Sequence, residues 1–258
     1  MIPIRDGFIK THSMSKTLCQ LSAFVFVITL PLLAFAGPPF LSDDPTPTDY
    51  QHFEVYLFSN GTTTRDNVKG NAGIDFNYGA TPDLQLTAVL PWSYERPIGA
   101  HFTSGLGNIE LAAKYRFLHQ EGLDWDVAVF PRLFLPSGSS QGEHHASLLI
   151  PIWLGKNWAN WSTFGGGGCA LNRGGDSKDY CVAGWALTRR LRPDLQLGAE
   201  LYYRSADTKG ESASTTLGFG ATYDFSARFH ALGYVGSGLK NAAETGRTLW
   251  YASLLFTF

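Results

Sequence analysis

Charged side chains recur inside apolar segments of this chain, at alternate positions. A clear example runs from residue 109 to residue 117, where Glu110, Lys114 and Arg116 alternate with large apolar side chains. Successive side chains of an extended strand point to opposite faces, so these three charges share one face. Such a face offers ionic and hydrogen-bonding contacts, while its apolar counterpart needs a non-aqueous environment.

The charged positions of all such faces form a set of candidate functional residues. The set consists of Glu54, Asp75, Glu110, Lys114, Arg116, Asp126, Arg132, Glu200 and Arg204. Both signs are present, so the pattern indicates neither an anion filter nor a cation filter. The same faces carry the aromatic side chains Tyr56, Phe58, Phe130, Phe134 and Trp153. A mixed lining of this kind could bind a small amphipathic or aromatic solute, and the alternative is a set of salt bridges that only stabilises the fold.

Residues suited to covalent chemistry are concentrated in one polar stretch. His144 and His145 follow Glu143, and Ser139 and Ser147 lie nearby. A hydrolase needs a nucleophile, a base and an orienting group in mutual hydrogen-bonding contact, and this grouping has no recognised spacing. We therefore expect no catalytic residues, no cofactor and no metal site. A barrel enzyme acting on lipid is kept as an alternative.

Two cysteines flank a polar stretch at residues 171–179. Cys169 and Cys181 would lie in an oxidising compartment after export, where disulfides persist. Antiparallel neighbouring strands could bring them within bridging distance. The sequence therefore predicts a disulfide that staples this loop, since no further ligands support a metal site.

Residues 1–36 predict a secretory signal peptide. A basic region precedes an apolar run from Leu21 to Phe35, and small residues stand at positions 34 and 36. We expect cleavage between Ala36 and Gly37, with Met14 as an alternative start of translation. A transmembrane helix fits less well, because the apolar run is short and contains Pro31.

The remaining 222 residues are sufficient for one large domain. They hold 17 basic and 21 acidic residues, a formal charge of −4, which argues against binding to nucleic acid. Residues 37–49 are rich in Pro and Asp and unsuited to a strand. We expect a periplasmic lead-in that acts as a plain linker, with a plug inside the fold as the alternative.

Residues 50–258 alternate apolar and polar side chains with period two, which is typical of strands with two different faces. About twelve segments of roughly ten residues follow one another, a length that suits a tilted strand crossing a bilayer. The segments are 50–60, 70–79, 83–94, 107–117, 124–135, 144–155, 159–169, 180–189, 194–204, 213–224, 227–236 and 247–258.

The connections between these segments differ in length in a regular way. Short turns at residues 80–83, 191–194 and 224–227 alternate with longer polar stretches, which we expect at residues 60–69, 95–107, 137–143, 171–179, 205–213 and 237–246. Short periplasmic turns and longer outer loops are typical of outer-membrane barrels. The sequence thus predicts an all-β, antiparallel, up-and-down transmembrane barrel of about twelve strands in a Gram-negative outer membrane.

The last segment supports this interpretation. Trp250, Ala252, Leu254, Phe256 and Phe258 share one face, and the chain ends at that final aromatic residue. A terminal aromatic on an alternating strand resembles the signal presented to the barrel assembly machinery. We therefore expect two partners, outer-membrane lipid and that machinery. A soluble β-barrel is the alternative, but its strands are usually shorter.

Three stretches resemble one known family: residues 38–45, residues 79–86 and, most specifically, residues 105–117 with the sequence GLGNIELAAKYRF. This is the outer-membrane transporter family associated with meta-pathway phenol degradation. The resemblance implies an outer-membrane barrel linked to the uptake of aromatic or other hydrophobic compounds. We accordingly expect a channel for passive or facilitated diffusion of small solutes. A lipid-modifying barrel and a structural or adhesive barrel are the alternatives.

Overall fold

Hydrogen bonds between neighbouring strands connect most of the described chain into one sheet. The protein is described from a computed structural model, and the described residues are 39–142 and 144–258. The expected signal peptide, residues 1–36, lies outside them, and its cleavage stays a prediction. In this described part, no helix is long and apolar enough to cross a bilayer.

The sheet consists of fourteen strand segments, with two short helices in the connections. The strand segments are β1 (Phe53–Thr63), β2 (Asn67–Thr81), β3 (Leu84–Pro97), β4 (Thr103–Leu106), β5 (Ile109–Leu118), β6 (Asp126–Val129), β7 (Arg132–Leu135), β8 (Ser147–Trp158), β9 (Trp161–Leu171), β10 (Tyr180–Arg192), β11 (Leu195–Arg204), β12 (Ser214–Asp224), β13 (Phe229–Lys240) and β14 (Thr248–Thr257). The helices are α1 (Gln120–Leu123) and α2 (Ala242–Thr245).

These fourteen segments form twelve barrel strands. β4 and β5 pair one after the other with β3, so together they make one barrel strand. β6 and β7 likewise pair in succession with β8, and they are separated by Pro131, which has no backbone N–H to give to the ladder. The sheet closes where β1 pairs with β14. The predicted antiparallel barrel of twelve strands is therefore confirmed.

The apolar face of each strand points away from the barrel interior. Leu90, Leu111 and Leu254 are about half exposed on the outer surface, whereas Lys114 and Glu200 are 4% and 1% exposed. An outer surface made of large apolar side chains around the whole sheet is unfavourable in water and suits acyl chains. The fold is that of an outer-membrane β-barrel, and it places the protein in the outer membrane.

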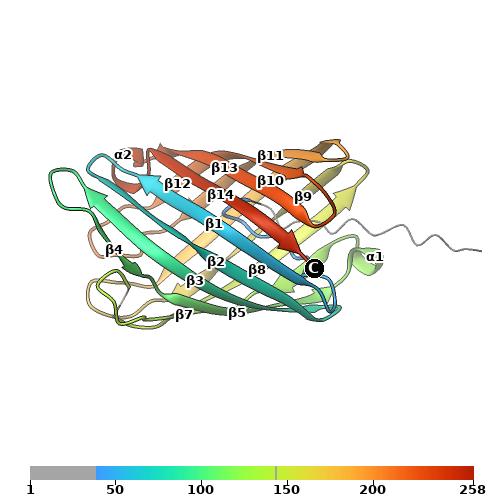
Figure 1. Ribbon diagram of the computed structural model, residues 1–258, viewed down its shortest axis with the longest axis horizontal. Coiled ribbons are helices and arrows are strands. Elements are labelled where there is room, and N and C mark those ends of the chain that lie inside the picture. Colours follow the sequence, from blue (N-terminus) through green and yellow to red (C-terminus); the bar gives the residue numbers. More distant parts are fainter. Residues whose placement is uncertain (1–38, 143) are drawn as a thin grey trace, which may run out of the picture. The chain divides into compact units, whose positions relative to one another are not determined.

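The two ends of the barrel differ. β1 begins beside the last residue, Phe258, at the end that carries the short turns at residues 82–83, 159–160 and 193–194. We call this the turn end and the opposite one the loop end. Figure 1 shows the C-terminus and α1 at the turn end and α2 at the loop end, with the strands tilted between them. Short turns at the end that holds the C-terminus are typical of the periplasmic side.

Two of the expected long loops are largely strand. The stretch from residue 60 to residue 69 belongs mostly to β1 and β2, which are joined by residues 64–66. The stretch from residue 95 to residue 107 contains the end of β3 and all of β4. Strands that extend beyond the bilayer meet water on both faces, so the apolar half of the alternating pattern disappears there and the sequence looks like a loop.

Candidate functional site: the barrel lumen

The barrel encloses a cavity of about 950 Å³. Its lining includes Lys69 and Glu95 near the loop end, and Asn160 and Arg190 at the turn end. The cavity therefore extends toward both ends of the barrel, and this is the geometry a solute path requires.

Six of the nine predicted lumen residues line this cavity, namely Glu54, Asp75, Glu110, Lys114, Asp126 and Arg132. Glu200 is buried deeper in the wall, beside the N-terminal residues described below. The other two lie near the barrel ends. Arg116 donates to Asp83 of a short turn, at 3.2 Å, and Arg204 pairs with Asp207 of an outer connection. Whether any of these side chains contacts a solute stays a prediction.

Glu110 and Arg132 form a bidentate ion pair across β5 and β7. Arg132 Nε lies 2.7 Å from Glu110 Oε1, and Nη2 lies 2.9 Å from Oε2. The guanidinium also stands over the rings of Phe130 and Phe134, and the ammonium of Lys114 stands over Phe130 at 5.1 Å. The predicted aromatic residues of the lumen thus pack against the predicted charges, which fixes the position of both.

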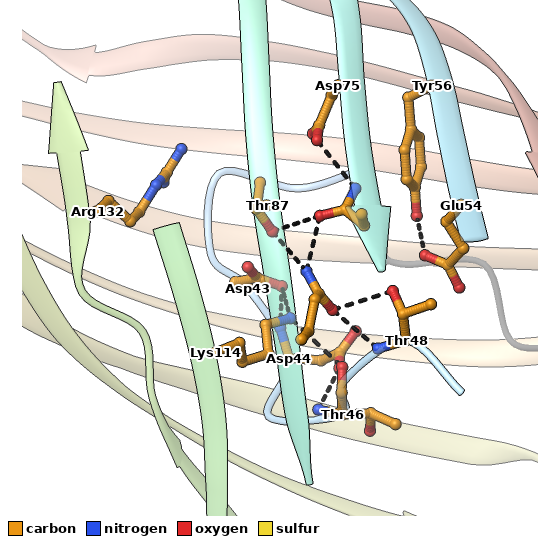
Figure 2. A network of polar contacts seen from close by, with 12 residues as sticks. Asp43, Asp44, Thr46, Thr48, Glu54, Tyr56, Asp75, Thr87, Lys114 and Arg132 are labelled. Atoms are coloured by element: carbon orange, nitrogen blue, oxygen red, sulfur yellow. Dashed lines mark hydrogen bonds and ion pairs between the residues drawn. The ribbon is translucent and has the colours of Figure 1, made fainter. Parts of the chain in front are cut away.

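A ladder of uncharged polar side chains lies on β2 and β3. Gln85 Nε2 donates to Asn77 Oδ1 at 2.8 Å, and the Thr87 hydroxyl donates to the same oxygen at 2.5 Å. Asn77 in turn donates to Asp75 at 2.9 Å (Figure 2). Sequence reasoning missed Asn77 and Gln85 because it selected only charged residues; their place on the polar face was the available signal.

Residues 39–48 line the cavity inside the barrel, so for this part of residues 37–49 the interpretation as a plain linker is wrong. We call residues Pro39–Thr48 the inner segment. Lys114 Nζ donates to Asp43 at 3.0 Å, and the Thr48 amide donates to Gln85 Oε1 at 2.8 Å (Figure 2). The ring of Phe40 packs against the wall residues Phe164 and Tyr234, with centroids 5.8 and 5.9 Å away. Contacts with residues far along the chain place the segment inside the barrel. The low strand propensity that suggested a linker gives no information on such contacts.

Two acidic groups outside the strands have altered pKa values. Enclosure within the barrel raises the pKa of the Asp44 carboxyl, the charge of Lys114 opposes this rise and the charge of Asp43 adds to it. At the loop end, burial is the largest influence on Asp207 and would raise its pKa, but the charge of Arg204 and the hydrogen bonds to the carboxylate together lower that pKa. The protonation of Asp44 is therefore linked to the position of the inner segment.

The predicted disulfide is present. Cys169 on β9 and Cys181 on β10 are directly opposite each other and their sulfurs are bonded. Both residues are exposed on the outer face of the sheet. The bond therefore ties the two strands that carry the connection at residues 172–179.

The histidines and serines of the outer connections have other partners. His145 Nε2 lies 3.1 Å from Asn172 Oδ1, and the Ser139 hydroxyl donates to the backbone oxygen of Leu106. His144 is exposed, and Glu143 lies outside the described residues. These contacts do not bring a serine and a histidine together as a nucleophile and its base. Within the described residues, no group of three or more His, Cys, Asp or Glu side chains is arranged to hold a metal ion.

Comparison with known proteins agrees with this geometry. The model of the family described as "Putative MetA-pathway of phenol degradation" matches residues 83–256, about two thirds of the chain. The chain belongs to this family. The search of curated protein sequences found no match to this chain.

Solved structures with the same fold include three outer-membrane proteins. An outer membrane channel from Pseudomonas putida F1 has a TM-score of 0.69 at 16% identity, over 83% of this chain and 98% of that one. The KdgM porin has a TM-score of 0.54 at 14% identity, over 79% of this family member and 99% of the porin. The NanC porin has the same TM-score, 0.54, at 10% identity, over 79% and 98% of the two chains. At these identities the similarity establishes the shared fold.

The interior also contains an apolar cluster, of which sequence reasoning placed only Tyr56 on the inner face. Tyr56, Leu232 and Leu255 form one buried cluster inside the barrel. Leu232 and Leu255 stand on strands where apolar residues occupy both faces, so alternation alone cannot assign them to the interior. The lumen is therefore partly apolar.

Proposed function

We propose that the protein is a passive channel through which small solutes diffuse across the outer membrane. The observation that carries this function is the lumen cavity, whose lining contains residues of both the loop end and the turn end. A barrel that served only as a structural anchor would have no need for such a path. Membership of a family with solved relatives of the same fold that are channels and porins supports the same function.

Small aromatic or amphipathic compounds are the solute class that we propose. The cavity lining combines aromatic rings with hydrogen-bonding groups: Phe58 stacks on Tyr251 at 6.4 Å, and Asp75 lies on the same wall. A flat ring can pack on such aromatic surfaces while a hydroxyl or amine group finds polar partners. The description of the family, which refers to phenol degradation, is consistent with this class.

Passive diffusion involves no covalent chemistry, and we propose no enzymatic activity. The contacts of Ser139 with Leu106 and of His145 with Asn172 support this view, because they occupy the side chains that a hydrolase would need free. Loss of phospholipid or lipopolysaccharide hydrolysis in a His144→Ala variant would instead favour the enzyme.

The test is solute flux into liposomes that contain the purified, folded protein. We expect uptake of phenol-sized and sugar-sized probes to rise above that of empty liposomes, with a limit on probe size. Val89 lines the cavity and its neighbour Leu90 faces outward, which provides a matched pair. Val89→Trp should reduce flux and Leu90→Trp should leave it unchanged. Absence of flux for every probe in the wild-type protein would contradict the channel function.

A further inference from the structure

One buried carboxylate holds the inner segment in place. Glu200 on β11 is 1% exposed, and both of its oxygens accept hydrogen bonds from backbone amides of that segment. The Leu41 amide donates to Oε2 at 3.1 Å and the Ser42 amide to Oε1 at 2.6 Å. A buried charge is costly unless it is well hydrogen-bonded, so this pairing satisfies the carboxylate and fixes the backbone at two consecutive residues.

The wall around Glu200 is shaped to receive the inner segment. A Cβ atom added at Gly184 would lie 2.2 Å from the Ser42 hydroxyl oxygen, and one added at Gly220 would lie 2.8 Å from the Phe40 ring. The same holds for Gly155, where an added Cβ would lie 2.7 Å from the ring of Pro45. Three separate strands thus leave out a side chain where the segment passes.

The inner segment crosses the lumen. Glu200 belongs to β11, while Gln85, the partner of Thr48, belongs to β3, and these two strands are six barrel strands apart in the closed ring of twelve. Lys114 on β5, next to β3, binds Asp43 between them. Residues of the segment from Pro39 to Thr48 also line the cavity, so the segment forms one boundary of the path.

From these observations, and resting on the channel function above, we propose that Glu200 is the positioning residue of the channel. It holds the inner segment against β10, β11 and β12, and the segment in this position sets the width of the path available to solutes. Glu200 itself does not line the cavity, so it acts through the segment and makes no contact with a solute.

The test is single-channel recording of the full mature chain in planar lipid bilayers. Glu200→Ala removes the acceptor of both amides, and hydrogen bonds to charged groups are strong, so the time spent in a high-conductance level should rise by about tenfold or more. Glu200→Gln keeps one carbonyl acceptor and should give an intermediate effect. The conductance, and the size limit for solutes, should both increase in the order wild type, Gln, Ala.

A second variant leaves Glu200 intact and tests the role of the inner segment through the direction in which the conductance changes. Gly220→Val adds bulk where Phe40 and Pro39 pass. Added bulk would narrow the lumen if the inner segment stayed in place. Because the valine side chain would collide with Phe40, we expect it to displace the segment and so to raise the conductance. Gly233→Val on β13 is the matched control, because no atom lies closer than 4.0 Å to a Cβ added there, and it should behave as wild type.

Cross-linking provides the reverse test. A Ser42→Cys, Gly184→Cys pair should form a disulfide that holds the segment and returns Glu200→Ala to wild-type conductance. Wild-type flux together with unchanged Glu200→Ala and reduced Gly220→Val conductance would overturn the role of Glu200 and leave the channel function standing. No current from any of the variants, although all are folded by heat-modifiable gel mobility, would overturn the channel function itself. A wild type that passes solutes in liposomes but carries much less current than Glu200→Ala would support the positioning role.

Discussion

Removing the charge of Arg132 should destabilise the barrel through the partner that it leaves behind. Glu110 is 6% exposed, and both of its oxygens bind the guanidinium at 2.7 and 2.9 Å. Arg132→Met keeps an unbranched apolar side chain at this position, but it removes the guanidinium that stands over Phe130 and Phe134 and leaves the carboxylate without a cation. Comparison with a variant that also lacks the Glu110 charge therefore separates the cost of the unpaired charge from the lost ring contacts.

The size of the effect follows from how much water reaches the pair. Leaving a buried charge unpaired costs about 3–5 kcal/mol. The Arg132 side chain is 31% exposed to the lumen, so water screens the remaining charge in part. We expect the free energy of unfolding to fall by about 2–3 kcal/mol, between the buried and exposed cases. The double variant Glu110→Gln, Arg132→Met should lose less than the Arg132→Met single variant, since no unpaired charge remains.

The assay is equilibrium urea unfolding in lipid vesicles, followed by tryptophan fluorescence, with heat-modifiable gel mobility as a second probe. Arg192→Met is the matched control, because Arg192 pairs with Asp194 at 3.1 Å and its side chain is 58% exposed. Loss of that surface pair should cost below about 1 kcal/mol. Our reasoning is refuted if Arg132→Met costs no more than Arg192→Met, or if the double variant is the least stable of the series.

Three further outcomes are expected. Replacing Cys169 and Cys181 by Ser should leave the barrel able to assemble but lower the free energy of unfolding by about 3 kcal/mol. Limited proteolysis should then cut the connection between the two residues more readily, and equal stability and protease resistance would count against the staple. The pKa of Asp44 is raised when the inner segment is in place, so docking of the segment takes up a proton; docking is strongest below the ordinary pKa of 3.8 and weakens as the pH rises through the raised value. The conductance should therefore rise over that range, and a response that persists in Asp44→Asn would exclude this group. Leu90→Arg on the outer face should cost about 2–4 kcal/mol of unfolding free energy in vesicles, whereas the same change at Phe225 in a turn should cost about 0–1 kcal/mol, and similar costs at both sites would contradict the assigned membrane position.

The inner segment shows where prediction from sequence failed. Its Pro and Asp residues exclude a strand, and that inference holds, but exclusion of a strand leaves both a linker and a plug open. The choice was made by partners far along the chain: Ser42 and Glu200 are 158 residues apart. Such a contact exists only after the barrel has closed, so no local pattern of residues announces it.

Pairing among the lumen charges was undetermined for the same reason. Alternation assigned Glu110, Arg132 and Asp75 to the interior face, but it gave no information on which charges would meet. Register and strand order decide that Arg132 binds Glu110 while Asp75 receives a hydrogen bond from Asn77. The interior position of Leu232 and Leu255 was likewise decided by packing across strands whose two faces are both apolar.

The sequence by itself determined the barrel. A period of two is a local property of each strand, and the bilayer imposes one solvent on the outer face, so Leu90 and Leu254 point outward whatever the rest of the chain does. It also determined the pairing of Cys169 with Cys181, which are close in sequence and flank one connection. Only the tertiary structure decided what occupies the interior, because the lumen is built from residues of every strand and its contacts arise when the first strand meets the last.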